Sequence, residues 1–212
     1  MSTPDGPAGS AAAPRPPAGA RATVQDRSTT RQRAMVDAAA RLLIEQGFGA
    51  VTHRQVARAA GVPQGSASYY FPTSASLVAA AVEAAEDLRA TAAHAHADAL
   101  ARRARSSTAT ARELIETLYA PHVDDSVVDV RLDPMLTAMR DPALRPIMRA
   151  SRPRLLAALR TVLDASGREG AEDVDLLGHV VDAALLAAAA EEDGKVLDRA
   201  TATVARVLDR WH

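Results

Sequence analysis

Alanine is the residue that most restricts what this chain can fold into. It occupies 49 of the 212 positions, while aromatic residues make up only 3% of the chain. Alanine favours helices, whereas β-sheets depend on β-branched and aromatic side chains. From residue 80 onward, no segment alternates polar and apolar residues as a half-buried strand does. The sequence therefore predicts an all-α protein whose helices pack closely through small side chains.

Several classes of chemistry are excluded by what the sequence lacks. It contains no cysteine, which rules out disulfides, cysteine-ligated zinc, iron–sulfur clusters and thiol nucleophiles. It also has no glycine-rich phosphate loop, nucleophile elbow or Glu-x-x-His pair. His94 and His96 lie two residues apart, so on a helix they point to nearly opposite sides and cannot share an ion. We therefore expect no enzymatic activity, no metal and no cofactor.

The first 28 residues differ from the rest of the chain. Residues 1–28 are rich in proline, alanine and glycine, a composition that predicts a disordered tail. The tail has no apolar stretch of the kind that a secretory signal requires. The longest uncharged run, residues 59–82, is interrupted by glycine and proline, so it is no membrane-spanning helix. We expect a cytoplasmic protein with no membrane contact. The tail arginines could touch DNA phosphates as a loose arm or stay solvated; they are Arg15, Arg21 and Arg27.

Charge is divided unevenly along the chain. Residues 1–80 contain eight arginines and four acidic residues, a balance of +4, and the remainder has 17 basic and 22 acidic residues, a balance of -5. The two parts sum to the net charge of -1. This asymmetry predicts that the front of the molecule meets a polyanion.

Helix boundaries are well marked at the start of this basic part. Ser28–Thr30 offer an N-cap to a helix that ends at Gly47, where a left-handed C-cap fits. Thr52 then caps a second helix, with Gln55 three residues later placed to complete a capping box.

The segments that follow complete a recognisable motif. The second helix ends at Gly61, a third spans residues 64–70, and Thr73 caps a fourth that runs to about residue 105. Two short helices joined by a turn that begins with glycine form a helix-turn-helix, whose second helix enters the DNA major groove. The same spacing also occurs at an ordinary corner of an all-α protein.

Three runs of sequence in this region resemble the TetR family of one-component transcriptional regulators. Residues 38–48 (AAARLLIEQGF) resemble the family's first helix, residues 52–62 (THRQVARAAGV) its second helix and turn, and residues 65–72 (GSASYYFP) its recognition helix. The resemblance implies a helix-turn-helix DNA-binding domain at residues 29–75 and a helical ligand-binding and dimerisation domain at residues 76–212. It also implies a bacterial homodimeric repressor that binds a pseudo-palindromic operator on double-stranded DNA and is released by a small-molecule effector.

The residue types fit these implied roles. Gly65 lets the backbone approach the DNA wall, Gln64 can pair with adenine, and Arg54 can hold a phosphate. The ring of Tyr69 could instead fill the small core, and Phe71 is placed as a core wedge. The expected DNA-contacting residues are Thr52, Arg54, Gln64, Gly65, Ser66, Ser68, Tyr69, Tyr70 and Ser74.

The chain departs from the family pattern at several points. Ser74, followed by Ala75, stands where the family usually carries a phosphate-gripping lysine, and Pro63 stands where a capping serine or threonine is common. The recognition helix has no cation of its own, so we expect modest non-specific DNA binding. The positive field must come from Arg27, Arg31, Arg33, Arg54 and Arg58.

The last two predicted helices carry regular apolar stripes. In the TetR family the two C-terminal helices form the dimer interface, and intramolecular core packing would produce the same pattern. The residues expected at the interface are Val174, Leu177, Val181, Ala184, Ala188, Leu197, Ala200, Val204, Val207 and Trp211.

The effector is not indicated by the sequence. Scarce aromatic residues argue against a large planar ligand held by stacking. The residues that could line a pocket are Tyr119, His122, Met135, Met139, Met148 and His179, each of which could equally be plain core or surface. The alternative function is a helical small-molecule-binding or interaction module that has lost DNA binding.

Overall fold

The computed structural model describes residues 18–121, 124, 131–170, 173–191 and 194–210. Every regular element within this part of the chain is helical, as the composition predicts. None of the described helices is both long and apolar enough to cross a membrane. The elements are α1 (Ala18–Gln46), a short 3-10 helix (Phe48–Ala50), α2 (His53–Ala59), α3 (Gln64–Tyr70), α4 (Ser74–Ala99), α5 (Ser107–Tyr119), α6 (Asp133–Arg140), α7 (Arg145–Ala165), α8 (Val174–Ala189) and α9 (Val196–Leu208).

The first helix begins earlier than its capping residues predict. It starts at Ala18, whereas the sequence places the start at Ser28–Thr30 and assigns residues 1–28 to a disordered tail. That expectation is wrong for residues 18–28, while residues 1–17 lie outside the described part. Residues 18–46 contain no proline, and the alanine, arginine and glutamine residues of this segment propagate a helix well.

A small core holds α1, α2 and α3 together. Met35 and Leu43 of α1 are buried against Val56 of α2 and Phe71, so the expected wedge role of Phe71 is confirmed. Gly47 and Gly61 have φ angles of 76° and 65°, values that favour glycine, at the two predicted helix ends. Ala59 is exposed and borders a surface hollow between α1 and α2.

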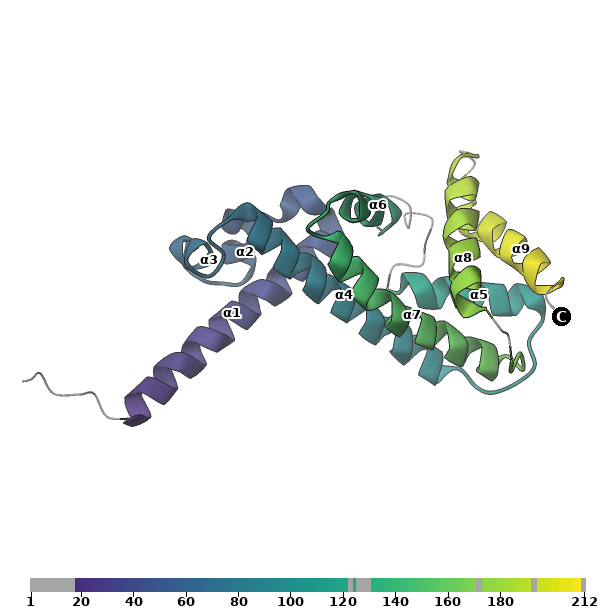
Figure 1. Cartoon of the computed structure of the whole chain (residues 1–212), viewed down its shortest axis with the longest axis horizontal. Coiled ribbons are helices and arrows are strands. Elements are labelled where there is room, and N and C mark those ends of the chain that lie inside the picture. The colour runs from purple at the N-terminus through teal and green to yellow at the C-terminus, as the bar shows by residue number, and fades with distance from the viewer. Residues whose placement is uncertain (1–17, 122–123, 125–130, 171–172, 192–193, 211–212) are drawn as a thin grey trace, which may run out of the picture.

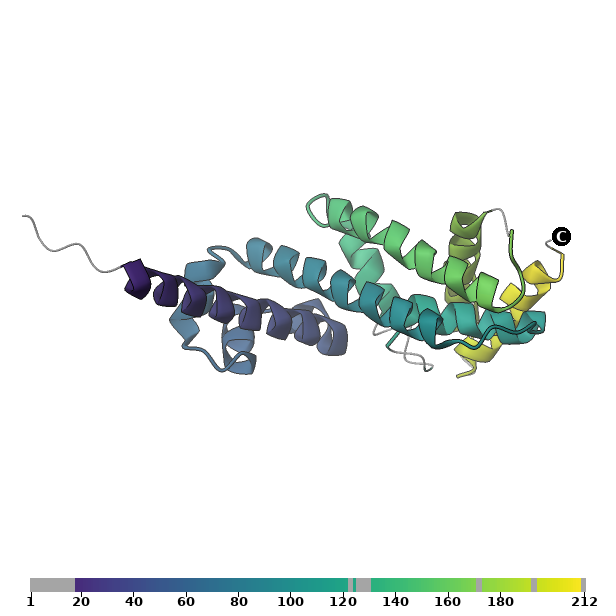
Figure 2. The same cartoon turned by 90° about the horizontal axis from the view of Figure 1, so that it is seen from below.

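Helix α4 is shared by two hydrophobic cores. Its first half, up to Ala85, packs in the N-terminal core, and its second half, from Ala90, packs in the C-terminal core. Figures 1 and 2 show α4 as the long element that joins the two parts of the molecule, with α7 alongside it. The predicted domain boundary at residue 75 therefore lies at the start of a helix that couples both parts.

Helix α4 ends at Ala99, six residues before the expected end. The following segment lies along the C-terminal end of α7, where the backbone N–H groups of Arg103 and Arg105 donate to the carbonyls of Ala165 and Ser166. The carbonyls at a helix end lack partners within the helix, so this segment satisfies them.

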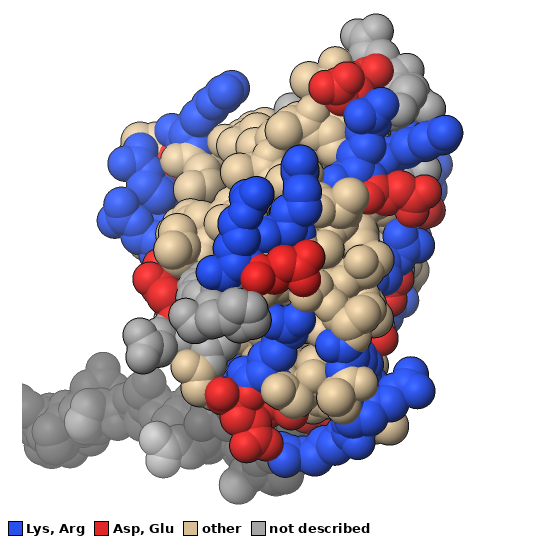
Figure 3. All heavy atoms as spheres, turned by 90° about the vertical axis from the view of Figure 1, so that its right-hand side faces the viewer, with Lys and Arg blue, Asp and Glu red and all other residues tan. Residues whose placement is uncertain are grey.

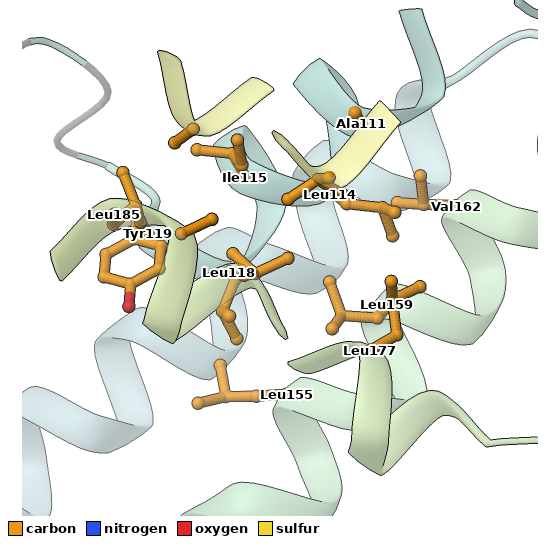
Figure 4. Close-up of a cluster of buried hydrophobic side chains, with 14 of the residues drawn as sticks. Ala111, Leu114, Ile115, Leu118, Tyr119, Leu155, Leu159, Val162, Leu177 and Leu185 are labelled. Carbon is orange, nitrogen blue, oxygen red and sulfur yellow. The ribbon is translucent and has the colours of Figure 1, made fainter. Parts of the chain in front are cut away.

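The C-terminal core is built by α5, α7, α8 and α9 around the second half of α4 (Figure 4). Its members are mostly leucine, valine and alanine. The regular stripes expected to form the dimer interface are largely this core, because Val174, Leu177, Val181, Ala184, Ala188, Leu197, Ala200 and Val204 are all buried within the chain. That assignment is therefore corrected for these eight residues; Val207 is half-buried and Trp211 lies outside the described residues.

Candidate nucleic-acid interface and effector region

The start of α2 is fixed by one half of the expected capping box. The Thr52 hydroxyl oxygen accepts a hydrogen bond from the backbone N–H of Gln55, at 3.2 Å. The return half is not formed, because the buried Gln55 Oε1 has no hydrogen-bond partner among the described residues. Thr52 itself is exposed, so its role here is to cap the helix that carries Arg54.

A histidine that sequence reasoning missed connects the two helices of the helix-turn-helix motif. His53 Nε2 donates to the carbonyl oxygen of Phe71, at 2.7 Å. This bond joins the first residue of α2 to the residue that ends α3, and so it holds the two helices at a fixed angle. No sequence signal could have found it, because the contact depends on how α2 packs against α3.

Helix α3 places its expected recognition residues on one accessible side. Ala67 is fully buried and faces the N-terminal core. Gln64, Gly65 and Ser68 are exposed, and Ser66 is half-buried. The structure therefore presents polar groups of a size suited to base edges and phosphates on a helix fixed from behind.

The two tyrosines of α3 have different surroundings. The side chain of Tyr69 is 79% exposed, which removes the alternative that its ring fills the core. Tyr70 is half-buried, and its hydroxyl shares a 2.8 Å hydrogen bond with Ser28 Oγ of α1. The two rings meet edge to face, with centroids 5.1 Å apart. Tyr70 thus supports Tyr69, which is the ring available to a partner.

Gly65 is not required by the protein's own packing. A Cβ atom built at this position would meet no described atom within 4 Å beyond its chain neighbours and the backbone of its own helix, and the backbone has no positive φ. Glycine costs stability in a helix relative to alanine. Its presence at an open position is therefore consistent with a close approach from outside the protein.

The cations around the motif lie beside α3 and not on it. Arg54 and Arg58 of α2 are exposed, as are Arg31 and Arg33 of α1. Ser74 is also exposed, in the first turn of α4, whose Thr73 and Ser76 form a reciprocal capping box. No side chain of Arg27 is described.

The expected ligand-pocket residues are not brought together. Tyr119 and Met135 belong to the C-terminal core, whereas Met148 packs against the N-terminal core. Met139 is 49% exposed, and His179 is exposed 3.9 Å from Asp175. His122 lies outside the described residues. Met135 and Met148 pack against two separate cores and Met139 is exposed, so the three methionines do not mark one site.

A buried cluster of charged groups lies instead where the two cores meet. Glu86 of α4 is 2% exposed, and its Oε1 is 2.7 Å from Arg89 Nη1 and 3.4 Å from Arg131 Nη1. The hydroxyl of Ser151, on α7, donates to Glu86 Oε2 at 2.7 Å. Burial raises the pKa of Glu86, but Arg131, Arg89 and the hydrogen bonds outweigh it, so the pKa is lowered. Sequence reasoning missed this cluster, because the partners come from distant segments.

A second polar group lies in the same domain. The Tyr119 hydroxyl donates to Asp182 Oδ1, and Arg152 Nη1 lies 3.8 Å from Asp182 Oδ2. Burial, followed by the nearby Asp182 charge, raises the pKa of Tyr119 well above its ordinary value. Burial also raises the pKa of Asp182, despite the opposing effects of Tyr119 and Arg152.

Of the two histidines near the end of α4, it is His96 that lies beside two carboxylates of α5, those of Glu113 and Glu116. Its Nε2 donates to Glu113 at 3.0 Å, and the ligand atoms of His96, Glu113 and Glu116 lie within 4.8 Å of one another. Arg112 Nε pairs with Glu116 at 2.9 Å, so a guanidinium already balances one of the carboxylates. The His96–Glu113 hydrogen bond between α4 and α5 and the Arg112–Glu116 ion pair within α5 account for this group, and the absence of a metal stays a prediction.

Comparison with known families and structures matches both parts of the chain. Residues 35–81 match the family described as bacterial regulatory proteins, tetR family, and residues 105–210 match the tetracyclin repressor-like C-terminal domain. Among curated proteins, none matches this sequence.

Solved structures extend the similarity over most of the chain. The multidrug binding protein EbrR complexed with proflavin is 28% identical over 86% of this chain and 99% of that chain, with a TM-score of 0.61. Its complex with ethidium is 29% identical over 85% of this chain and 98% of that chain, with a TM-score of 0.59. A tetR-family member from Streptomyces coelicolor A3 is 28% identical over 83% of this chain and 96% of that chain, with a TM-score of 0.52.

Proposed function

Because this chain belongs to the TetR family of transcriptional regulators, we propose that it is a homodimeric repressor that releases its operator when a small molecule binds the C-terminal domain. The observation that carries the proposal is the accessible polar side of α3. The opposite side of this helix packs in the N-terminal core through Ala67, and its end is bonded to α2 through His53 and the carbonyl of Phe71. Gln64 and Ser68 would read bases, Arg54 would hold a phosphate, and Tyr69 would contact the backbone or thymine methyls.

A homodimer is supported by an exposed apolar stripe on α8. Leu176 is 51% exposed and Leu186 is 41% exposed. Between them Val180 is half-buried and Ala183 is exposed, at helical spacing along the same side, which the exposed His179 shares. Figure 3 shows that charges of both signs are interspersed over this end of the molecule. A two-fold dimer would place two recognition helices about 34 Å apart, one duplex turn, on a pseudo-palindrome.

Release by an effector is supported by the shared role of α4. The N-terminal core fixes its first half to α1 and α3, and the C-terminal core fixes its second half. A ligand that changes the packing of the C-terminal core would thus move the DNA-binding domain. It must bind the DNA-incompetent arrangement more tightly than the competent one.

Selection of bound duplexes from a random pool by the purified full-length protein tests the DNA proposal. We expect an enriched inverted repeat. Gln64→Ala should cost about 1–3 kcal/mol at one base position, whereas Arg54→Ala should weaken binding to all sequences and reduce the salt slope by about one. Arg149→Ala, an exposed arginine on α7, is the matched control and should bind as the unchanged protein does.

Absence of any enriched repeat, with both variants behaving as the control does, would contradict the repressor. That result would favour the alternative, a helical small-molecule-binding module that has lost DNA binding. The uncharged recognition helix is the observation that keeps this alternative open.

A further inference from the structure

The buried cluster around Glu86 carries more positive than negative charge. Arg89 and Arg131 are each 5% exposed, and Glu86 is the carboxylate they share. The second oxygen of that carboxylate accepts from Ser151. Buried charges are normally balanced by partners, because their desolvation costs several kcal/mol or more. Two guanidiniums therefore face one carboxylate that is already fully engaged.

Arg131 is the member of this charged cluster whose N–H donors lack hydrogen-bond acceptors among the described groups. Its Nε and Nη1 atoms are buried and make no hydrogen bond to any described group, although Nη1 lies within ion-pair distance of Glu86. A guanidinium has five N–H donors and stays charged in proteins, so unsatisfied donors of this kind are rare in a buried position. Among the residues that the structure describes, this position lacks an acceptor.

The neighbouring acidic group does not supply that acceptor. Asp182 is near enough to interact electrostatically with Arg131, but it accepts from the Tyr119 hydroxyl and lies 3.8 Å from Arg152. Arg152 also pairs with Asp175, at 2.8 Å, so the guanidiniums of Arg89, Arg131 and Arg152 meet three carboxylates, those of Glu86, Asp175 and Asp182. The formal charges of these described groups balance, and what Arg131 lacks among them is an acceptor for its Nε and Nη1 donors.

The cluster lies where an effector would act on α4. Glu86 directly follows the last α4 residue of the N-terminal core, Ala85, and Ser151 lies on the helix that runs beside α4. Arg131 precedes α6, whose Ala138 packs in the N-terminal core. A ligand that draws Arg131 away from Glu86 would change the charge balance at the junction of the two cores.

We propose that Arg131 binds an anionic group, a carboxylate or a comparable oxyanion, of the effector. This rests on the proposed function, because it names the chemical class of the effector for the same domain. The surrounding core is mostly aliphatic, which favours an aliphatic body for that anion. The proposal separates this chain from EbrR, whose structures contain proflavin and ethidium. Both of those dyes are cations, and the buried guanidinium of Arg131 would oppose a cation beside it.

Hexanoate and its neutral analogue hexanamide form the matched probe pair, measured by titration calorimetry on the full-length protein. We expect hexanoate to bind at least about tenfold more tightly than hexanamide, and proflavin to bind more weakly than hexanoate. Arg131→Met should weaken hexanoate binding by at least about tenfold, the loss of one charge-assisted hydrogen bond, and leave hexanamide unchanged. Arg140→Met, an exposed arginine of α6, is the control and should change neither.

Stability separates a binding role from a structural one. Methionine fills the space of an arginine stem without charge, and Glu86 keeps Arg89 and Ser151, so Arg131→Met should unfold at an equal or higher temperature. Equal binding of hexanoate and hexanamide, absence of binding by both, tighter binding of proflavin, or unchanged hexanoate binding by Arg131→Met would each overturn the proposal. The operator selection described above is run separately. An operator without hexanoate binding refutes the anion site alone, and hexanoate binding without an operator refutes the repressor alone.

Discussion

At the scale of single residues, two kinds of position are informative. At one kind the residue has no role in the protein's own packing, and at the other several side chains converge on it. Gly65 is a position of the first kind, because no described residue packs into the space of its missing side chain. Glu86 is the opposite case, since three side chains are arranged around its carboxylate. Each case leads to a separate prediction.

Gly65→Ala should separate stability from DNA binding. Alanine is preferred to glycine in helices, so the free energy of unfolding should rise by up to about 1 kcal/mol. Operator affinity should fall, because the new methyl group would lie between the backbone and the DNA. Chemical denaturation and a DNA-binding titration measure the two effects, and an unchanged affinity would show that α3 does not approach DNA at this residue.

Glu86→Gln should destabilise the protein and change its response to acid. Removing one partner leaves two buried guanidiniums uncompensated, at a cost of about 3–5 kcal/mol at neutral pH. The folded-state pKa of Glu86 is lowered, so its contribution is present above 4.5, its ordinary value, and is lost as the pH falls through the folded value. The stability difference between the two proteins should therefore shrink as the pH falls below 4.5 in urea unfolding series. A constant difference over that range would contradict the assignment.

At the scale of elements, the relative placement of α2 and α3 depends on a contact that neither helix makes alone. The bond from His53 to the Phe71 carbonyl is short and half-buried. It connects the first residue of α2 to the residue that follows α3. Thr52 and Thr73 act differently, because each caps the helix that follows it.

His53→Ala should lower the free energy of unfolding by about 0.5–1.5 kcal/mol. It should also weaken operator binding, because α3 would lose a restraint on its orientation. His94→Ala, at a half-buried histidine of α4 far from the motif, is the matched control for thermal unfolding and DNA titration. Equal effects of the two substitutions on operator affinity would argue against an orienting role for His53.

At the scale of the whole molecule, the two ends are linked by α4 and distinguished by their surfaces. The N-terminal end presents arginines beside an uncharged recognition helix, and the C-terminal end presents an apolar stripe on α8. The proposed dimer joins two such chains at the second end and leaves the first free for DNA.

Leu176→Glu should convert the proposed dimer to monomers, because a charge would be placed in the apolar stripe of each partner. Analytical ultracentrifugation measures the change. Leu88→Glu is the matched control, since Leu88 of α4 is also an exposed leucine, 45% accessible, away from that stripe. A Leu176→Glu protein that sediments as the unchanged protein does would show that the stripe is not the interface.

Local features of the chain were predictable because they depend on neighbours in sequence. The bounds of α3, the caps at Thr52 and Thr73, and the turns at Gly47 and Gly61 follow from side-chain chemistry within a few residues. The all-α class follows from the abundance of alanine and the missing strand alternation. The start of α1 was predicted too late, because capping residues indicate where a helix can begin and do not prevent an earlier start.

Only the tertiary structure decided which apolar stripes form the core, because a stripe in a core and a stripe in an interface have the same sequence pattern. The stripes of α8 and α9 would look the same in a dimer interface or a core, and packing against α5 and α7 assigns them to the core. The Glu86 cluster joins residues up to 65 positions apart, and no local pattern marks such a pairing. The sequence by itself determined the helices and the recognition motif, since those interactions are short in range. The tertiary structure decided the faces, the buried charges and the contact between α2 and α3, since burial is a property of the assembled chain.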